Sequence, residues 1–208
     1  MSRVGFEYWA ALAGDSPTSR TEWAAVVGAW SEPRRRYHDL AHLAAVLSIV
    51  DELAEHATDP AAVRLAAWYH DVAYDPQRSD NEQVSAARAR IGLLGLVSPD
   101  TVTEVARLVL LTAGHDATPD DANGAVLCDA DLAVLASPPP AYAGYASAVR
   151  AEYGHFYDEE FTAGRIAVLE GLLALPALFR TPVAAARWTE PARANLAAEL
   201  SLLRARST

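Results

Sequence analysis

Histidine and aspartate residues gather at three places in this chain of 208 residues. The first is the stretch R-R-R-Y-H-D-L-A-H at residues 34–42, where His38 and His42 are four positions apart. In a helix over residues 38–56 these two imidazoles lie one turn apart on the same face. Neutral imidazole is the commonest transition-metal ligand in proteins. The spacing allows a metal site, but two exposed histidines also occur at this spacing without one, so the pair alone leaves both interpretations open.

The second place is W-Y-H-D at residues 68–71, where His70 is followed directly by Asp71. Adjacent helical residues point about 100° apart, so both can bind one ion only if the ion lies between their faces. A structural pair in which His70 donates to Asp71 is the alternative. The preceding segment is apolar and contains Trp68 and Tyr69, which we expect in the core. Two polar side chains are costly there unless they are paired or bind a metal.

The third place is C-D-A-D-L at residues 128–132, which contains Asp129 and Asp131. Residues two apart point in nearly opposite directions on a helix, so only one of them is expected to join a shared site. The neighbours of Asp131 at helical spacing are apolar: Leu127, Cys128, Val134 and Leu135. An acid on such a stripe needs a cation. Asp129 is the alternative ligand, a residue that orients a ligand histidine, or a helix cap.

The elements that must position these residues are helical. Alanine and leucine are abundant, and no segment alternates apolar and polar residues before a hairpin turn. Asp59-Pro60, Ser98-Pro99 and Thr189 before Glu190-Pro191 are typical of helix starts, and the prolines at 138–140 must end a helix. The predicted helices cover 4–13, 20–31, 38–56, 60–74, 80–96, 99–114, 124–136, 140–155, 159–174 and 188–206. The sequence thus predicts one compact all-α domain over residues 1–208.

Composition limits the function. The net charge is −10, and the one dense basic run is residues 34–36, so a general nucleic-acid binder is not expected. A small anionic substrate fits, because a bound metal reverses the local charge. No apolar stretch is long enough for a membrane span and no secretory signal is visible. The single Cys128 cannot form an internal disulfide. These features favour a cytoplasmic protein.

Taken in order, His42, His70-Asp71 and Asp131 form the pattern H…HD…D, which resembles the HD-domain superfamily of metal-dependent phosphohydrolases. Locally, Y-H-D-L-A-H-L-A-A-V-L at residues 37–47 is similar to the Y-H-N-x-x-H-A-A-D-V motif of cyclic-nucleotide phosphodiesterases in the same superfamily. The segments R-R-Y-H-D-L-A-H, Y-H-D-V-A-Y-D, N-E-Q-V-S-A and D-A-D-L are similar to motifs of a bacterial group of predicted HD phosphohydrolases. The resemblance covers residues 35–155.

The resemblance implies a single HD-type helical bundle in which His42, His70, Asp71 and Asp131 bind a divalent metal. The helical segments outside residues 35–155 would then be extensions packed on this core. His38 would stand beside the metal and donate a proton to the leaving oxygen, and Asp71 would take part in catalysis. Such a metal lowers the pKa of its bound water and polarises a phosphoryl oxygen. An imidazole one turn away can protonate the departing alkoxide.

The sequence departs from binuclear members of the superfamily, which use two further histidines between the HD pair and the last aspartate. Only His115 lies in that interval, and Glu82 falls near the place of the other. The site is therefore either mononuclear, or binuclear with Glu82 and His115 as added ligands. Asn81 and Glu82 are alternatively a capping cluster, and His115 alternatively an exposed turn residue. Mn, Fe, Co, Ni, Zn and Mg all remain open.

Two arginines are candidates for phosphate binding. Arg150 lies among tyrosines at near-helical spacing, and Arg36 closes the arginine run. For Arg150 the alternative is a surface arginine paired with Glu152 or Glu159. For Arg36 the alternative is a solvated arginine triplet. The sequence does not predict the oligomeric state.

We therefore expect a metal-dependent phosphohydrolase that cleaves a phosphomonoester or phosphodiester of a small molecule, such as a nucleotide. Two other functions stay open. One is a non-catalytic helical module that binds a metal or nucleotide. The other is a di-iron oxygenase on the same fold.

Overall fold

The computed structural model describes residues 2–206, and within them it contains ten α-helices and no β-strand. The helices are α1 (Phe6–Ala13), α2 (Pro17–Trp30), α3 (Leu40–Glu52), α4 (Pro60–Tyr69), α5 (Asn81–Gly92), α6 (Pro99–Leu111), α7 (Ala122–Leu132), α8 (Pro139–Glu152), α9 (Asp158–Ala174) and α10 (Pro182–Arg206). Short 3₁₀ helices follow α3 (η1, Ala54–His56) and α7 (η2, Ala133–Ala136). The all-α prediction is confirmed. None of these helices combines the length and the apolar character that crossing a membrane requires.

Capping residues fix most helix starts. Asp59 and Ser98 each accept a hydrogen bond from the backbone N–H three residues later, with proline at the first helical position, as predicted. Ser16 caps α2 in the same way, and α2 begins at Pro17, three residues before the predicted start. The predicted start at Thr189 is wrong, because α10 begins at Pro182 and continues through Pro191. The signature that operates there is Thr181-Pro182, where Thr181 Oγ1 accepts from the N–H of Ala184.

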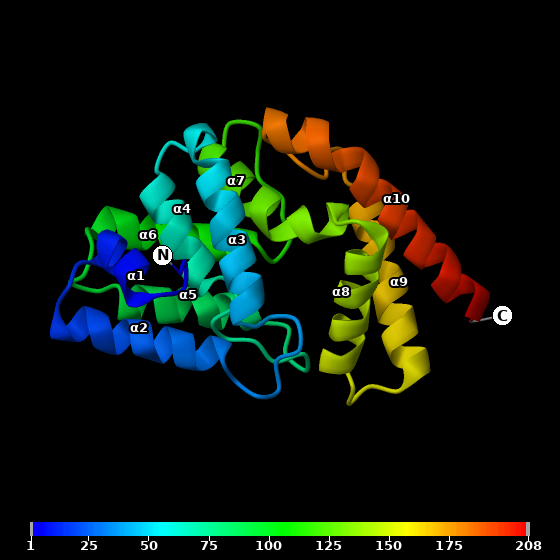
Figure 1. Ribbon diagram of the computed structural model, residues 1–208, viewed down its shortest axis with the longest axis horizontal. Coiled ribbons are helices and arrows are strands. Elements are labelled where there is room, and N and C mark those ends of the chain that lie inside the picture. Colours follow the sequence, from blue (N-terminus) through cyan, green and yellow to red (C-terminus); the bar gives the residue numbers. More distant parts are fainter. Residues whose placement is uncertain (1, 207–208) are drawn as a thin grey trace.

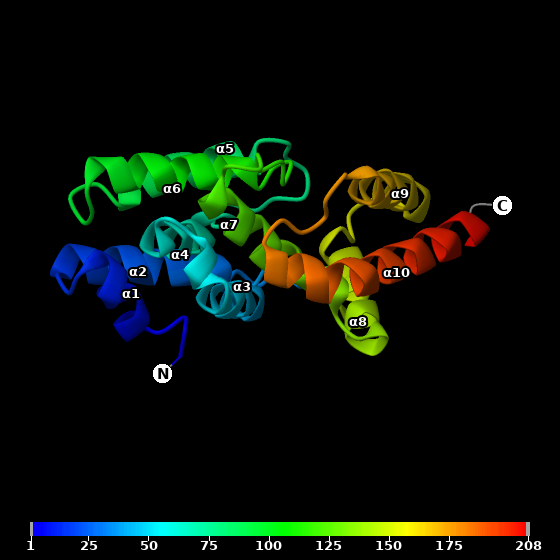
Figure 2. The same ribbon diagram turned by 90° about the horizontal axis from the view of Figure 1, so that it is seen from above.

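The helices form two groups joined by α7 and η2. Helices α1 to α6 lie at one end of the molecule and α8 to α10 at the other, in both ribbon views (Figures 1 and 2). One continuous cluster of buried apolar side chains extends through both groups, from Trp9 in α1 to Leu203 in α10. The separation of a motif-bearing core at residues 35–155 from terminal extensions stays a prediction.

Three helices carry the candidate site. Helix α3 packs against α4 and α7, and α4 packs against α7. Behind them the fully buried Trp30 donates from Nε1 to the carbonyl of Trp68, and its ring lies 5.3 Å from that of His70. Trp68 and Tyr69 are themselves fully buried, as predicted. A buried apolar wall therefore supports the polar side chains on α3, α4 and α7.

Candidate metal centre

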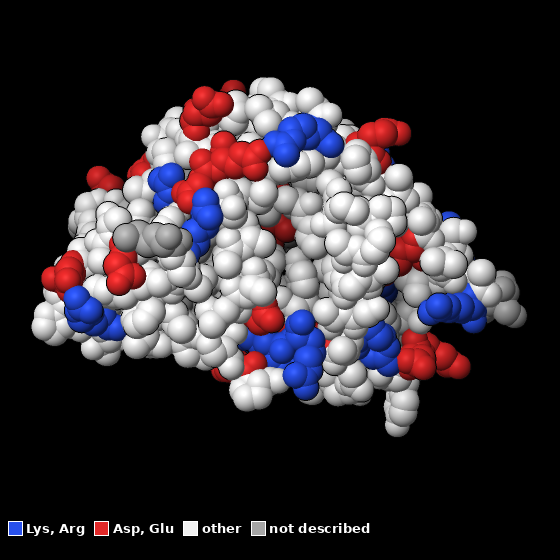
Figure 3. Space-filling view, viewed as in Figure 1, with Lys and Arg blue, Asp and Glu red and all other residues white. Residues whose placement is uncertain are grey.

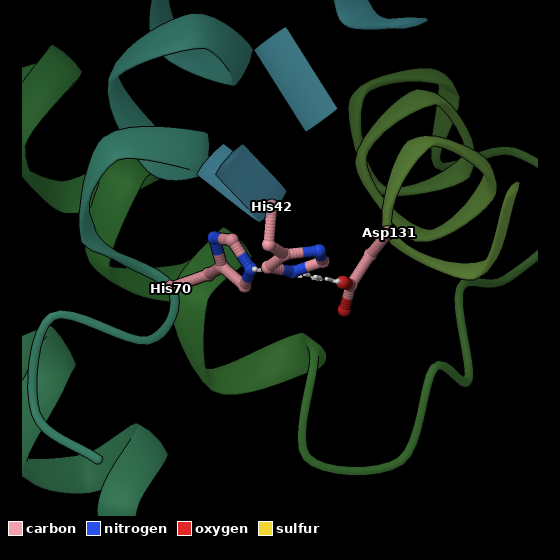
Figure 4. Close-up of side chains that lie close together, drawn as sticks. All are labelled: His42, His70 and Asp131. Carbon is pink, nitrogen blue, oxygen red and sulfur yellow. Dashed lines mark hydrogen bonds and ion pairs between the residues drawn. The ribbon is translucent and has the colours of Figure 1, made fainter. Parts of the chain in front are cut away.

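Two imidazoles and one carboxylate converge at the junction of α3, α4 and α7. Nε2 of His42 lies 3.2 Å from Nε2 of His70 and 3.2 Å from Oδ1 of Asp131. The third side of this triangle, from His70 Nε2 to Asp131 Oδ1, is 3.6 Å. Figure 4 shows the two rings and the carboxylate pointing toward one another from three separate chain segments. These three residues, the ligand triangle, could hold a metal ion.

The triangle fits the dimensions of a metal site. Ligand atoms at about 2.0–2.1 Å from a tetrahedral ion lie about 3.3 Å from one another, close to the three separations found here. In addition, Nδ1 of His70 lies 2.7 Å from the carbonyl of Ala67, which can only accept a hydrogen bond. Nδ1 therefore carries a proton, and in the neutral ring the Nε2 lone pair points into the triangle. Such an outer hydrogen bond orients most metal-binding histidines.

The electrostatics of the triangle also favour a cation. Burial lowers the pKa of His42. Burial alone would lower the pKa of His70 as well, but the charges of Asp71 and Asp131 outweigh it and raise that pKa to about 9. Burial would raise the pKa of Asp131, yet the charge on His70 and hydrogen bonds from the surrounding histidines hold it well below its usual range. Without a metal, His70 therefore stays protonated at neutral pH, so that a positive charge already lies where a metal ion would bind.

Local folding explains how the two histidines of the first motif separate. The predicted helix 38–56 is wrong at both ends, since α3 begins at Leu40 and ends at Glu52. Asp39 is its N-cap and accepts hydrogen bonds from the N–H groups of Ala41 and His42. His42 lies in the first turn, whereas His38 precedes the helix. The two imidazoles are therefore not equivalent residues on one helix face.

His38 is held beside the triangle by Glu152, the last residue of α8. Oε2 of Glu152 lies 2.6 Å from Nδ1 of His38, and Oε1 accepts from the N–H groups of Arg36, Tyr37 and His38. Burial would raise the pKa of Glu152, but these hydrogen bonds outweigh it and lower the pKa to about 2. Since the ionised carboxylate only accepts, Nδ1 of His38 must be the donor.

The remaining ring nitrogen of His38 faces the second motif. The imidazole stacks on Tyr74, with ring centroids 4.0 Å apart, and its Nε2 lies 3.9 Å from Oδ2 of Asp71. The same Asp71 oxygen is 3.4 Å from Nε2 of His70. Asp71 thus lies between the ligand triangle and His38. Its membership of a metal ligand set stays a prediction.

The second motif lies at a helix end. The predicted helix 60–74 is wrong at its C-terminal end, because α4 ends at Tyr69. The chain turn that follows is fixed by Arg35, whose buried guanidinium donates to the carbonyls of His38, Asp71 and Val72 at 2.8, 2.8 and 3.0 Å. One arginine therefore joins the first and second motifs through their backbones.

His115 is brought to the site from the loop after α6. Its Nε2 lies 2.9 Å from Oδ2 of Asp131, the oxygen that does not belong to the triangle. Its φ of +50° lies in the left-handed region that residues other than glycine rarely adopt. The expected alternative of an exposed turn residue does not fit this contact. The role of His115 as a ligand of a second metal stays a prediction.

Asp129 does not orient a ligand histidine, and that expectation is wrong. Its fully buried carboxylate accepts from the backbone N–H groups of Arg180 and Thr181 at 2.8 and 2.7 Å. These two residues directly precede α10. Asp129 therefore secures the start of the last helix, on the side of α7 away from the site, whereas Asp131 faces the triangle.

The segment at 81–86 supports the loop after the second motif. Asn81 Oδ1 accepts from the N–H of Asp75, and its amide donates to the carbonyl of the same residue. Ser85 bonds the backbone of Ala73 in the same two-sided way. Glu82 is half-buried and forms no hydrogen bond or ion pair within residues 2–206. The two hydrogen bonds between Asn81 and the backbone of Asp75 give Asn81 a structural role rather than one in the metal site.

A cleft of about 500 Å³ opens beside the triangle, between α3, η2 and α8, and both His42 and Asp131 line it. Figure 3 shows the hollow beside α3, with an acidic side chain recessed in it and basic side chains at one end. Arg36 lines this cleft, and its guanidinium forms no ion pair within the described part of the chain. Arg150 does not line the cleft. It pairs with Asp158 and donates to the carbonyls of Tyr153 and Phe156.

Sequence reasoning missed two residues that organise the site. Arg35 belongs to the R-x-Y-H motif, but nothing in the sequence distinguishes it from Arg34 and Arg36. Glu152 has no local signal at all, because its partners lie 114 to 116 positions earlier in the chain. A buried acid at the end of a helix becomes meaningful only when the fold is known.

No protein-family model matches this chain, and neither the curated proteins nor the solved structures contain a detectable relative.

Proposed function

We propose that this protein is a metal-dependent phosphohydrolase of the HD type that cleaves a phosphomonoester or phosphodiester of a small molecule. The observation that carries the proposal is the ligand triangle with His38 beside it. His42, His70 and Asp131 match the spacing of metal ligands. Nε2 of His38, the ring nitrogen that Glu152 does not bind, lies beside them, 3.9 Å from Oδ2 of Asp71. A metal site without an adjacent proton donor would not favour this reaction over simple metal binding.

The chain's own residues have distinct tasks in the proposed reaction. A divalent ion held by the triangle supplies a more acidic bound water and a positive charge for a phosphoryl oxygen. Arg36, which lines the cleft without an ion-pair partner, binds the other phosphate oxygens. Asp71 accepts the proton of the attacking water. His38, protonated at Nε2, donates to the leaving oxygen as the phosphorus–oxygen bond breaks, and Glu152 holds the ring in the orientation this transfer requires.

The donor set supports a transition metal more than magnesium, because two of the three ligand atoms are imidazole nitrogens. We propose Mn, Fe, Co, Ni or Zn, one per chain at the triangle, with His115 and the second oxygen of Asp131 as the starting point of a second site. We also propose a cytoplasmic location, which the single buried Cys128 supports.

The proposal is tested with protein loaded separately with each of these metals. Turnover is measured on 4-nitrophenyl phosphate, bis(4-nitrophenyl) phosphate, nucleoside monophosphates and cyclic nucleotides, with His38→Ala as the matched variant. We expect turnover with at least one metal. In the variant, at unchanged metal content, turnover of the nucleotides should be lost, whereas the nitrophenyl esters, whose leaving group needs no proton, should be affected much less. Full metal occupancy without turnover of any ester would contradict the proposal and would favour a non-catalytic binding module. Two bound irons with oxygen consumption would favour an oxygenase.

A further inference from the structure

The cleft beside the ligand triangle has walls of small apolar residues. Two faces of helices α3 and α8 line its opposite sides, with Ala41 and Ala45 on the first and Ala141, Gly144 and Ala148 on the second. The ribbons of the two helices stand apart in both views, joined at one side by α7 and η2 (Figures 1 and 2). A Cβ added to Gly144 would meet no atom within 4 Å. Small residues therefore keep this space open.

Polar and charged groups of the cleft gather at one end. Arg36, Tyr37, Asp39, His42 and Asp131 line that end, where the ring of Tyr37 lies 4.8 Å from that of His42. Oδ1 of Asp39 already accepts from two backbone N–H groups. From His42 to Ile49 the cleft follows α3 for about 10 Å, given the rise of a helix. Over this length the α3 side chains in the cleft are Ala45, Val46 and Ile49, and the helix backbone is bonded internally.

The opposite wall offers little more hydrogen bonding. Its face carries Ala141, Gly144 and Ala148. The hydroxyl of Tyr145 accepts a hydrogen bond from Arg165 and keeps one proton to donate, but its ring lies against Tyr37, toward the polar end. Ser137 carries the one aliphatic hydroxyl among the residues that line the cleft. A sugar or nucleoside placed here would lose hydrogen bonds to water at several hydroxyl and ring positions without replacement. An alkyl or aryl group would instead gain from leaving water.

We propose that the cleft binds the alcohol part of the substrate and that this part is an apolar alkyl or aryl group rather than a sugar or nucleoside. This inference rests on the proposed phosphohydrolase function and names its substrate class. The phosphate lies at the end formed by Arg36 and the triangle, and the apolar group extends along α3 and α8 toward Ile49. The size of the cleft suits a group of drug-like dimensions.

Binding of non-hydrolysable phosphonates tests the substrate class separately from catalysis. Metal-loaded protein is titrated calorimetrically with methyl-, butyl- and hexylphosphonate and with adenosine 5′-monophosphate. We expect the affinity to rise about four-fold per added methylene, as for transfer of such groups out of water. Hexylphosphonate should therefore bind at least 100-fold more tightly than methylphosphonate, and more tightly than the nucleotide.

Two substitutions that fill the cleft test whether the alkyl group binds there. Gly144→Phe and, from the opposite wall, Ala45→Leu should each reduce the gain from methyl to hexyl by 10-fold or more. Gly164→Phe is the control, because Gly164 is also an exposed helical glycine with open space at its Cβ but does not line the cleft. We expect this control to bind as the unmodified protein does.

The outcomes separate the two proposals. Affinity that does not rise with chain length, or tighter binding of the nucleotide, overturns the apolar substrate class whether or not esters are hydrolysed. A rise with chain length that both cleft variants abolish, without hydrolysis of hexyl phosphate or any other ester, supports the apolar site and contradicts the phosphohydrolase.

Discussion

Glu152 and His38 are 114 positions apart in the chain, yet Oε2 of the first lies 2.6 Å from Nδ1 of the second. The same carboxylate accepts three backbone N–H groups of the segment that carries His38. The last residue of α8 thus fixes both the position and the protonated nitrogen of the imidazole beside the ligand triangle.

Glu152→Gln is expected to impair the proton donor without removing the metal. Because the amide lacks the charge that holds His38, kcat for an alkyl phosphate should fall about 10-fold or more, and His38→Ala should cost about 100-fold or more. Nitrophenyl esters should suffer much less, since nitrophenolate leaves without a proton. Comparison of kcat and KM for the two ester classes, with metal content measured in parallel, checks this. An equal loss for both classes would indicate a purely structural role for Glu152.

The ligand triangle is expected to determine metal content. His42→Ala and Asp131→Ala should each weaken binding of a transition metal by more than about 100-fold, since even outer partners of ligands contribute 10-fold to 100-fold. Elemental analysis and competition with a chelating dye measure this. His155→Ala is the control, because it removes an exposed histidine outside the triangle. If either triangle variant keeps normal occupancy, that residue is not a ligand.

Metal affinity is expected to increase with pH. The pKa of His70 without metal is about 9, above the ordinary value of 6.5, so the ring is protonated at neutral pH and a metal must displace that proton. Between about pH 7 and 9 the affinity should rise close to 10-fold per unit and then level off. In the metal-free protein the sign is opposite, because stability from the charged ring is lost as the pH rises through 9. Calorimetry in buffers of different ionisation enthalpy counts the released proton, and no proton release at pH 7 would contradict the assignment.

Arg35 and Arg34 are expected to differ sharply although they are adjacent. Arg35→Ala leaves the buried carbonyls of His38, Asp71 and Val72 without donors and should destabilise the fold by at least about 3 kcal/mol. Arg34→Ala removes an exposed pair with Glu32 and should cost less than about 1 kcal/mol. Urea unfolding gives both values. Should Arg35→Ala not fold, Arg35→Lys, which retains the charge but not the planar donors, provides the comparison. Similar values for positions 34 and 35 would refute the role given to Arg35.

Asp129 and Asp131 are likewise expected to separate structure from chemistry. Asp129→Ala removes the acceptor of two backbone N–H groups before α10 and should lower stability by about 2 kcal/mol while metal binding persists. Asp131→Ala should do the reverse, with loss of metal and a smaller effect on the metal-free fold. Thermal unfolding with and without chelator distinguishes the two variants, and metal loss in Asp129→Ala would contradict this division.

Much of the architecture follows from local sequence signals. Asp59-Pro60 and Ser98-Pro99 begin helices because their chemistry is complete within one turn. Thr189 fails as a start because the residues around Pro191 are already helical and remain so, and the true signal lies at Thr181. Helix ends are harder to predict. Tyr69 ends α4 where Arg35, distant in sequence, takes the following carbonyls.

In the candidate site, too, features with a local sequence signal could be predicted, whereas features that depend on long-range contacts could not. The types and order of His42, His70 and Asp131 could be recognised from the sequence, since each is a ligand-type residue in an apolar setting. The residues that contact and orient these side chains could not be recognised from the sequence. Which face of α7 meets the segment before α10, and hence that Asp129 is structural, depends on packing between parts of the chain that are distant in sequence. The arginine run separates in the fold into a surface residue, a buried link and a cleft residue, although its three members are identical in type.

The ligand triangle has a further consequence for folding. His42 and Asp131 are separated by about 90 residues of chain, so an ion held between them is a cross-link that closes a long loop. A covalent bridge over such a loop reduces the entropy of the unfolded chain by an amount equivalent to about 4–5 kcal/mol. An ion that binds only the folded chain adds stability according to its free concentration. Metal supply would thus regulate how long the folded molecule survives, independently of any reaction at the site.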